Sequence, residues 1–153
     1  GAHSAGAQIA GTALLDPQWL AAHGHSAGEV RGFVGISGVY DVPAQVEFSQ
    51  RHGGYGRYVE DVMGGRANLV AASPLSHVGP HAPPTLLIHG DRDETVPMTT
   101  SATFDERLRA AGVPREFIGY RGGGHSGLLF QALAENPARL MTDVLRFVRQ
   151  VTD

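Results

Sequence analysis

The serine at position 4 stands in a setting that is typical of a nucleophile. Residues 2–6 read AHSAG, so small residues two places before and two places after Ser4 would relieve the crowding of a sharp strand-to-helix turn. Such a turn exposes the hydroxyl at the start of a helix, where free N–H groups favour negative charge. The N–H of Ala5 is the expected donor to the oxyanion formed when Ser4 attacks a carbonyl. Taken alone, the same serine could equally be a helix N-cap.

A second serine, Ser26, fits the G-x-S-x-G form of this motif more closely. Residues 24–28 read GHSAG. The motif requires a strand before the serine and a helix after it. Residues 16–23 show no strand pattern, and residues 30–36 (VRGFVGI) predict a strand rather than a helix. We therefore predict that Ser4 is the nucleophile and that Ser26 is a polar loop residue.

His125 is the candidate base. It lies in residues 121–126 (RGGGHS), directly after a predicted strand, and the glycines would let the backbone bend so that the imidazole reaches another loop. Imidazoles titrate at about 6.5, so a histidine can take a serine proton near neutral pH and return it to the leaving group.

The candidate acid lies in residues 90–97 (GDRDETVP), which contain three carboxylates. A carboxylate that accepts the second ring N–H of the base would fix its tautomer and stabilise the imidazolium. Asp91 and Asp93 are both reachable by spacing, and Glu94 is the weaker candidate. Position alone does not choose between the two aspartates. The order Ser, Asp, His is one that a sheet of parallel strands can support.

The elements that must position these residues alternate between strand and helix. Apolar runs predict strands, the spacing of apolar residues predicts helices, and glycine or proline lies between them. This alternation predicts an α/β fold with a mostly parallel sheet flanked by helices, whose reactive groups collect at the carboxyl ends of the strands. The predicted strands are 30–36, 84–89 and 115–120, and the predicted helices are 5–15, 97–112 and one from Pro137 with Leu140, Met141, Val144, Leu145, Val148 and Val151 on one face.

Composition excludes several classes of protein. The 153 residues fit one domain, and the net charge of −3, without a basic stripe, argues against nucleic acid as a partner. No apolar stretch reaches the ~18 residues of a membrane span. The absence of cysteine excludes disulfides, thiolate metal sites and a cysteine nucleophile. It does not fix the compartment, for which the cytoplasm is the expectation, and the oligomeric state stays open.

Several motifs together resemble the α/β-hydrolase superfamily. In order along the chain they are AHSAGAQ, GISGVYD, ASPLS, PPTLLIHGDRDETVP and GGGHSGLL. The chain is most similar to the branch of small carboxylesterases that includes arylformamidases and prenylcysteine methylesterases. The resemblance covers nearly the whole chain and implies an α/β-hydrolase fold, a serine esterase activity, and no metal or organic cofactor. It implies a Ser4–Asp93–His125 triad, because the acid of this group is the Asp of a G-x-x-D-x-x-V-P loop.

The chain departs from this group in two ways. Ala2 stands where the group has glycine. The group's amino-terminal half, with its H-G-G oxyanion loop, would lie upstream of Ser4, so we interpret residues 52–54 (HGG) as coincidence. The chain is therefore expected to be the C-terminal part of one α/β-hydrolase domain, without the strand that carries Ser4. Without this neighbour, strand 30–36 would be an open edge, and the chain alone would be poorly active.

The expected substrate is a small ester or amide, held under a cap-like insertion at residues 42–72. This segment is expected to contain short helices at 44–50 and 56–63. His3, Tyr40 and Tyr58 are the expected substrate contacts, and Phe48, Tyr55 and Met63 are further candidates; ordinary packing explains these aromatic side chains at least as well. A peptidase or lactone hydrolase on the same triad, or a non-catalytic remnant that only binds, are the alternatives.

Overall fold

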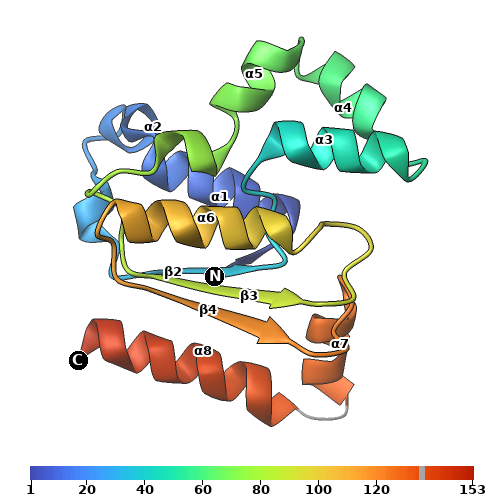
Figure 1. Cartoon of the computed structure of the whole chain (residues 1–153). Helices are drawn as coiled ribbons and strands as arrows, with labels where there is room; N and C mark the ends of the chain where they lie inside the picture. Colours follow the sequence, from blue (N-terminus) through green and yellow to red (C-terminus); the bar gives the residue numbers. More distant parts are fainter. Residues whose placement is uncertain (135–136) are drawn as a thin grey trace.

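Four parallel strands run through the centre of the structure, a computed structural model that describes residues 1–134 and 137–153 (Figure 1). Their order in the sheet follows the chain, and the register places Phe33 beside Thr85 and Thr85 beside Arg115. The strands are Ala2–His3 (β1), Phe33–Ile36 (β2), Thr85–Gly90 (β3) and Arg115–Tyr120 (β4). The predicted parallel α/β architecture is confirmed.

Helices cover both faces of the sheet (Figure 1). One face carries α1 and α6, with α3, α4 and α5 stacked further out, and the other carries α7 and α8. The helices are Ala5–Leu15 (α1), Pro17–Ala21 (α2), Val42–Arg51 (α3), Gly56–Val62 (α4), Arg66–Ala71 (α5), Thr99–Ala110 (α6), Gly127–Ala134 (α7) and Pro137–Thr152 (α8), with 3₁₀ turns at Ala27–Glu29 (η1) and Pro74–His77 (η2).

The central strand β3 explains how the core is divided between the two faces. Successive side chains of a strand point to opposite faces. Leu87 therefore packs with Phe104 of α6 on one face, while Leu86 packs with Phe147 of α8 on the other. Both leucines of β3 are fully buried. A strand covered on both faces needs a continuous apolar run, which is why residues 84–88 (PTLLI) do not alternate with polar residues.

Helix 5–15 and strand 115–120 have the predicted bounds, whereas strand 30–36 begins only at Phe33. The N–H of Val30 closes the η1 turn by donating to Ala27, and the N–H of Phe33 makes the first bond to the neighbouring strand, at Pro84. Helices α2, α5 and α7 were not predicted. In α8, Leu140 is buried and Val144 and Val151 pack on the core, but Met141, Leu145 and Val148 are exposed, so the predicted apolar face is only partly covered.

The expectation that no strand carries Ser4 was wrong. Ala2 and His3 form the short strand β1, which pairs with Gly35 and Ile36 of β2. The N–H of Ser4 then donates to the carbonyl oxygen of Ile36 over 3.0 Å, which extends the pairing to Ser4 itself. Strand β2 therefore has a neighbour on both sides and is not the open edge; β1 is the terminal strand of the described sheet.

A third apolar cluster holds α3, α4 and α5 in place. Val42 and Val46 of α3 are buried against Leu69 of α5 and against Val96 in the loop after β3. Val59 of α4 packs on the edge of this cluster. The predicted short helices of the insertion correspond to α3 and α4. Since Val96 lies three residues after Asp93, this cluster fixes the three helices beside the ends of the strands.

Candidate active site

Ser4 occupies a strained turn between β1 and α1. Its φ of 55° and ψ of −128° lie in a region that residues other than glycine rarely adopt. Strain of this kind is common at functional sites, where the surrounding structure holds it. Here the N–H bond to Ile36 anchors one side of the turn, and α1 begins at once on the other. Ala2 packs on the core beneath the turn, so alanine is accommodated where the resembling group has glycine.

His125 links Ser4 to Asp93. Its Nε2 lies 2.8 Å from the hydroxyl oxygen of Ser4, and its Nδ1 lies 2.8 Å from Oδ2 of Asp93. The imidazole is mostly buried and the carboxylate is fully buried. The structure thus brings together the three side chains that the sequence singled out, in the hydrogen-bond order that a serine, a base and an orienting acid require.

The carboxylate of Asp93 is strongly held in its ionised form. Burial by itself raises the pKa of Asp93, but hydrogen bonds from the His89 ring, the Val96 N–H, the His125 ring and the Thr95 N–H outweigh it, so the pKa lies well below its usual range. The two backbone bonds, 3.0 Å from Thr95 and 2.8 Å from Val96, both reach Oδ1. They leave Oδ2 directed at the imidazole of His125.

Asp91, the alternative acid, points elsewhere. Its Oδ1 accepts the N–H of Gly122 over 2.6 Å, so it ties the loop after β3 to the loop after β4. These loops cross at very short range: a Cβ on Gly90 would lie 2.1 Å from the carbonyl oxygen of Gly123. Glycine is therefore required at position 90, where the two loops that carry the acid and the base meet.

Ser26 lies in a setting that does not suit a nucleophile. It is exposed and caps the short η1 turn, with a capping box that it shares with Glu29. The Ser26 N–H donates to Oε1 of Glu29 over 2.9 Å, and His25 binds the other carboxylate oxygen. Ser26 follows α2 and a turn, so no strand leads directly into it. The structure thus places this serine as the polar surface residue that its context predicted.

The Ser4 hydroxyl opens into a cavity of about 270 Å³. Most of its lining is apolar and comes from α1, α3 and α4 and from the segment after β2. The lining residues are Ser4, Ala5, Gln8, Val39, Val42, Gln45, Val46, Ser49, Tyr55, Gly56, Val59 and Val96. Ala5 is the first residue of α1, so its N–H has no acceptor within the helix and can serve a bound anion. This cavity would therefore accept a small apolar group beside the Ser4 hydroxyl.

The aromatic side chains expected to bind substrate mostly do not line this cavity. Tyr40 is fully buried in the core, where it stacks on Phe104 at 4.3 Å, so its predicted contact with substrate is wrong. Tyr58 is exposed and lies outside the lining. His3 packs against His125, with ring centroids 4.7 Å apart, and its Nε2 lies 3.1 Å from the His125 carbonyl oxygen.

Two further candidates, one aromatic and one sulfur-containing, pack within residues 42–72. Phe48 stacks on His52 at 4.2 Å, and Met63 packs on the cluster around Leu69. Tyr55 is the one candidate of this group that lines the cavity. The HGG run at 52–54 follows α3, where His52 Nδ1 lies 2.7 Å from the Phe48 carbonyl oxygen, so it caps the helix end.

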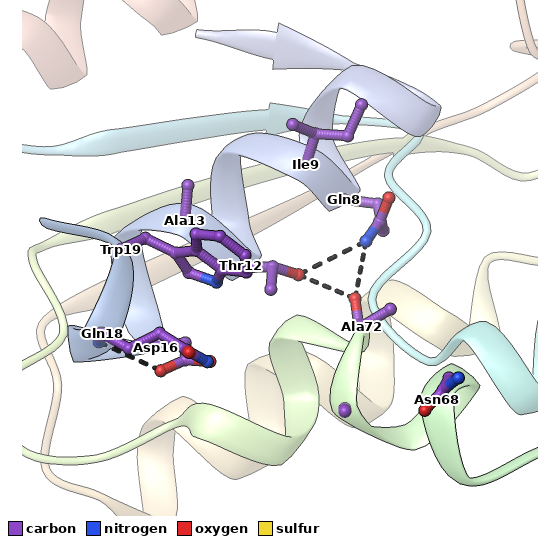
Figure 2. Close-up of a pocket in the computed structure, with 10 residues that line it drawn as sticks. Gln8, Ile9, Thr12, Ala13, Asp16, Gln18, Trp19, Asn68 and Ala72 are labelled. Atoms are coloured by element: carbon purple, nitrogen blue, oxygen red, sulfur yellow. Dashed lines mark hydrogen bonds between the residues drawn. The ribbon is translucent and has the colours of Figure 1, made fainter. Parts of the chain in front are cut away.

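A larger hollow of about 500 Å³ is also lined by Gln8 (Figure 2). Figure 2 shows the Gln8 amide and the Thr12 hydroxyl both directed at the carbonyl oxygen of Ala72, at 2.6 and 2.7 Å. These bonds join α1 to the segment after α5. No histidine is among the described residues that line it, so it offers its hydroxyl groups no imidazole base. The smaller cavity is therefore the candidate active site.

Two residues of the site escaped the sequence analysis. His89, at the end of β3, shares the carboxylate of Asp93 with His125. The sequence feature that could have identified it is a histidine inside an otherwise apolar strand. Gln8 lines both hollows, and its position one helical turn after Ser4 was the signal there.

Within residues 1–134 and 137–153, no group of three or more His, Asp or Glu side chains is arranged so that it could hold a metal ion. No described helix is long and apolar enough to cross a membrane.

Comparison with known proteins agrees with this geometry. A profile of the prolyl oligopeptidase family matches residues 4–153. The chain is similar to the isoprenylcysteine alpha-carbonyl methylesterase ICME of Arabidopsis thaliana, with 31% identity over 140 residues that cover 84% of this chain and 33% of the relative. The chain thus spans about a third of the length of that curated relative. The predicted resemblance to prenylcysteine methylesterases is confirmed.

Solved structures show the same fold. A truncated form of a carbohydrate esterase from gut microbiota matches 99% of this chain and 58% of its own, with a TM-score of 0.68 and 20% identity. An acylaminoacyl peptidase in complex with a chloromethyl ketone matches 96% of this chain and 22% of its own, with a TM-score of 0.70 and 19% identity. Together with the family match, these structures confirm the α/β-hydrolase fold. Since one is an esterase and the other a peptidase, the fold does not define the substrate.

Proposed function

We propose, from the premise that this chain belongs to the prolyl oligopeptidase family, that it is the C-terminal part of a serine hydrolase that cleaves a carboxylic ester or an aryl amide. The observation that carries the proposal is the pair of 2.8 Å contacts that join Ser4 to His125 and His125 to Asp93. In this proposal residues 42–72 form a cap-like insertion in a single α/β-hydrolase domain, and the substrate is a small molecule.

The first half-reaction transfers the acyl group to the enzyme. His125 Nε2 takes the proton of Ser4 as the serine oxygen attacks the carbonyl carbon. The Ala5 N–H, at the positive end of α1, donates to the oxyanion of the tetrahedral intermediate. His125 then gives the proton to the leaving oxygen or nitrogen, the bond to the carbonyl carbon breaks, and an acyl-serine remains.

The second half-reaction regenerates the serine. Water replaces the leaving group and loses a proton to His125 as it attacks the acyl-serine carbonyl. When the second tetrahedral intermediate breaks down, His125 returns the proton to the Ser4 oxygen and the carboxylic acid leaves. Throughout, ionised Asp93 stabilises the imidazolium that forms twice in each cycle.

A peptidase activity is the second candidate, and the name of the matching family favours it. The 31% identity to a methylesterase favours the ester. Initial rates on p-nitrophenyl acetate and on an N-acylated amino-acid p-nitroanilide would separate the two. A peptidase would cleave the anilide at a comparable kcat/KM, whereas an esterase would strongly prefer the ester.

Labelling with a fluorophosphonate tests the proposal directly. We expect the probe to modify Ser4, located by peptide mass spectrometry, and we expect His125→Ala to abolish the label because the serine loses its base. Label on Ser26, or no label even on a longer chain that includes the upstream half of the domain, would contradict the proposal. The second outcome would favour a protein that binds without catalysis.

A further inference from the structure

His89 is a buried histidine that the reaction described above does not use. It is fully buried at the carboxyl end of β3, and its Nε2 lies 3.0 Å from the carbonyl oxygen of Val96 and 3.2 Å from Oδ2 of Asp93. Its Nδ1 lies 2.7 Å from the hydroxyl oxygen of Ser101 in α6. Both ring nitrogens are therefore engaged, one of them with the proposed catalytic acid.

The partners fix the tautomer of His89. A carbonyl oxygen can only accept, so Nε2 must carry the proton that faces Val96 and Asp93. Among the described residues the Ser101 hydroxyl has no other hydrogen bond, so it donates to an unprotonated Nδ1. The single N–H of the ring then donates to the Val96 carbonyl oxygen and also lies beside Oδ2 of Asp93, which is 3.2 Å from Nε2.

The carboxylate oxygen that faces His89 is the one that faces His125. Oδ2 of Asp93 lies 2.8 Å from His125 Nδ1 and 3.2 Å from His89 Nε2, while Oδ1 is occupied by the two backbone N–H groups. The titratable groups that face this oxygen are thus the two histidines, and His3 packs on the outer side of the His125 ring. A second donor on one oxygen reduces the basicity that this oxygen presents to the first.

We propose that His89 is a positioning residue, which holds Asp93 in place through Nε2–H and limits how strongly that carboxylate attracts the proton of His125. This inference rests on the proposed triad. It adds a series of contacts behind the triad, which runs from Ser101 of α6 through His89 to Asp93. Without the second donor, Asp93 would bind the imidazolium more strongly. His125 would then stay protonated to a higher pH and would be a poorer base near neutrality.

Two amide variants of His89 provide a matched test. The Nε2 amide of glutamine can occupy the place of the imidazole Nε2, so His89→Gln keeps a donor to Asp93. Asparagine reaches only the position of Nδ1, so His89→Asn keeps the contact with Ser101 and loses the donor. His89→Leu removes both, and Ser101→Ala removes only the group that fixes the tautomer.

The titration of His125 is followed by NMR of histidine-labelled protein, with His125→Ala to assign the signal. We expect the titration midpoint to move up by about half to one pH unit in His89→Leu and His89→Asn, and to stay in place in His89→Gln. Ser101→Ala should move it in the same direction by less. The acid limb of kcat/KM on p-nitrophenyl acetate should move with the midpoint, since it reports the same group in the free enzyme.

A purely structural role for His89 would lower thermal stability without moving the titration. Equal midpoints for the Asn and Gln variants, in chains that circular dichroism shows to be folded, would overturn the proposal. If His89→Leu does not fold, the comparison of His89→Asn with His89→Gln still tests the proposal. The NMR titration needs no turnover, so a chain that binds without catalysis would contradict the proposed function and would still test the role of His89.

Discussion

The Ser4 hydroxyl oxygen and His125 Nε2 lie 2.8 Å apart although 121 positions of sequence separate them. Parallel strands make this contact possible, because the carboxyl ends of β1 and β4 lie at the same end of the sheet, with β2 and β3 between them. The loops that follow these strands then bring the two side chains into contact. The proposed chemistry therefore depends on the register of the sheet as much as on the three side chains.

Removal of the Ser4 hydroxyl should abolish catalysis and leave the fold intact. Ser4→Ala is expected to lower kcat on p-nitrophenyl acetate by at least about 10⁴-fold, since loss of the nucleophile in a serine protease costs this much or more. The matched control is Ser26→Ala, which removes an exposed capping hydroxyl and should leave kcat within about twofold, at a cost of ~1 kcal/mol or less in the local cap. Stopped assays on both variants decide, and equal losses would show that Ser4 is not the nucleophile.

The two aspartates of the loop after β3 should separate activity from stability. Asp93→Asn is expected to lower kcat by about 10⁴-fold, because the amide cannot hold the imidazole in the required tautomer. Asp91→Asn keeps an oxygen for the Gly122 N–H and should retain most of the activity, while unfolding midpoints in urea fall by the equivalent of about 1 kcal/mol. The reverse pattern would identify Asp91 as the acid.

Spacing could not choose between these aspartates, since only one residue, Arg92, separates them on the same loop. The choice is made by the fold of the loop, in which the N–H groups of Thr95 and Val96 bind one oxygen of Asp93 and direct the other at His125. Only the likeness to a known family pointed to Asp93 beforehand. By contrast, the glycine-rich loops and the order of the three residues along the chain could be read directly from the sequence.

The errors of the sequence analysis have physical causes. Strand β1 is only two residues long, too short for any alternation to be seen, and only its partner β2 makes it a strand. Tyr40 was expected to contact substrate, with ordinary packing as the alternative, and its ring fills the core beside Phe104. Long-range packing decides both outcomes, whereas strand 115–120 was bounded correctly by its own residues and its flanking turns.

The stability of the chain should fall in acid through Asp93. The pKa of Asp93 is lowered in the folded state below the ~3.9 of an unfolded aspartate, so the unfolded chain binds the proton more readily. Its contribution is fully present above about pH 5 and is lost as the pH falls through the unfolded value towards the lower, folded one. Urea midpoints between pH 3 and 7 should therefore drop more steeply in the wild type than in Asp93→Asn, and parallel curves would contradict the assignment.

Two positions on helix α4 test whether the acyl group of the substrate binds in the Ser4 cavity. Val59 of α4 lines the cavity, and Val62, one turn later, is exposed and does not. Val59→Trp should reduce kcat/KM for p-nitrophenyl butyrate about tenfold or more and for the acetate much less, because the indole occupies the space of a longer acyl chain. Val62→Trp adds the same side chain outside the cavity and should change neither rate. A similar effect of the two variants would place the acyl group elsewhere.

Tyr40 and Gly35 offer a test of the corrected core. A Cβ on Gly35 would lie 2.0 Å from the Tyr40 hydroxyl oxygen, which is buried and has no hydrogen-bond partner among the described residues. Gly35→Ala should therefore destabilise the chain by about 3 kcal/mol. Tyr40→Phe removes an unsatisfied hydroxyl and should be neutral or stabilising by up to ~1 kcal/mol, with KM unchanged. In the double variant the two changes should couple, so that Tyr40→Phe recovers part of the loss, as a double-mutant cycle of urea unfolding would measure. Additive effects would mean that the two groups do not touch. A raised KM in Tyr40→Phe would mean that this tyrosine contacts the substrate.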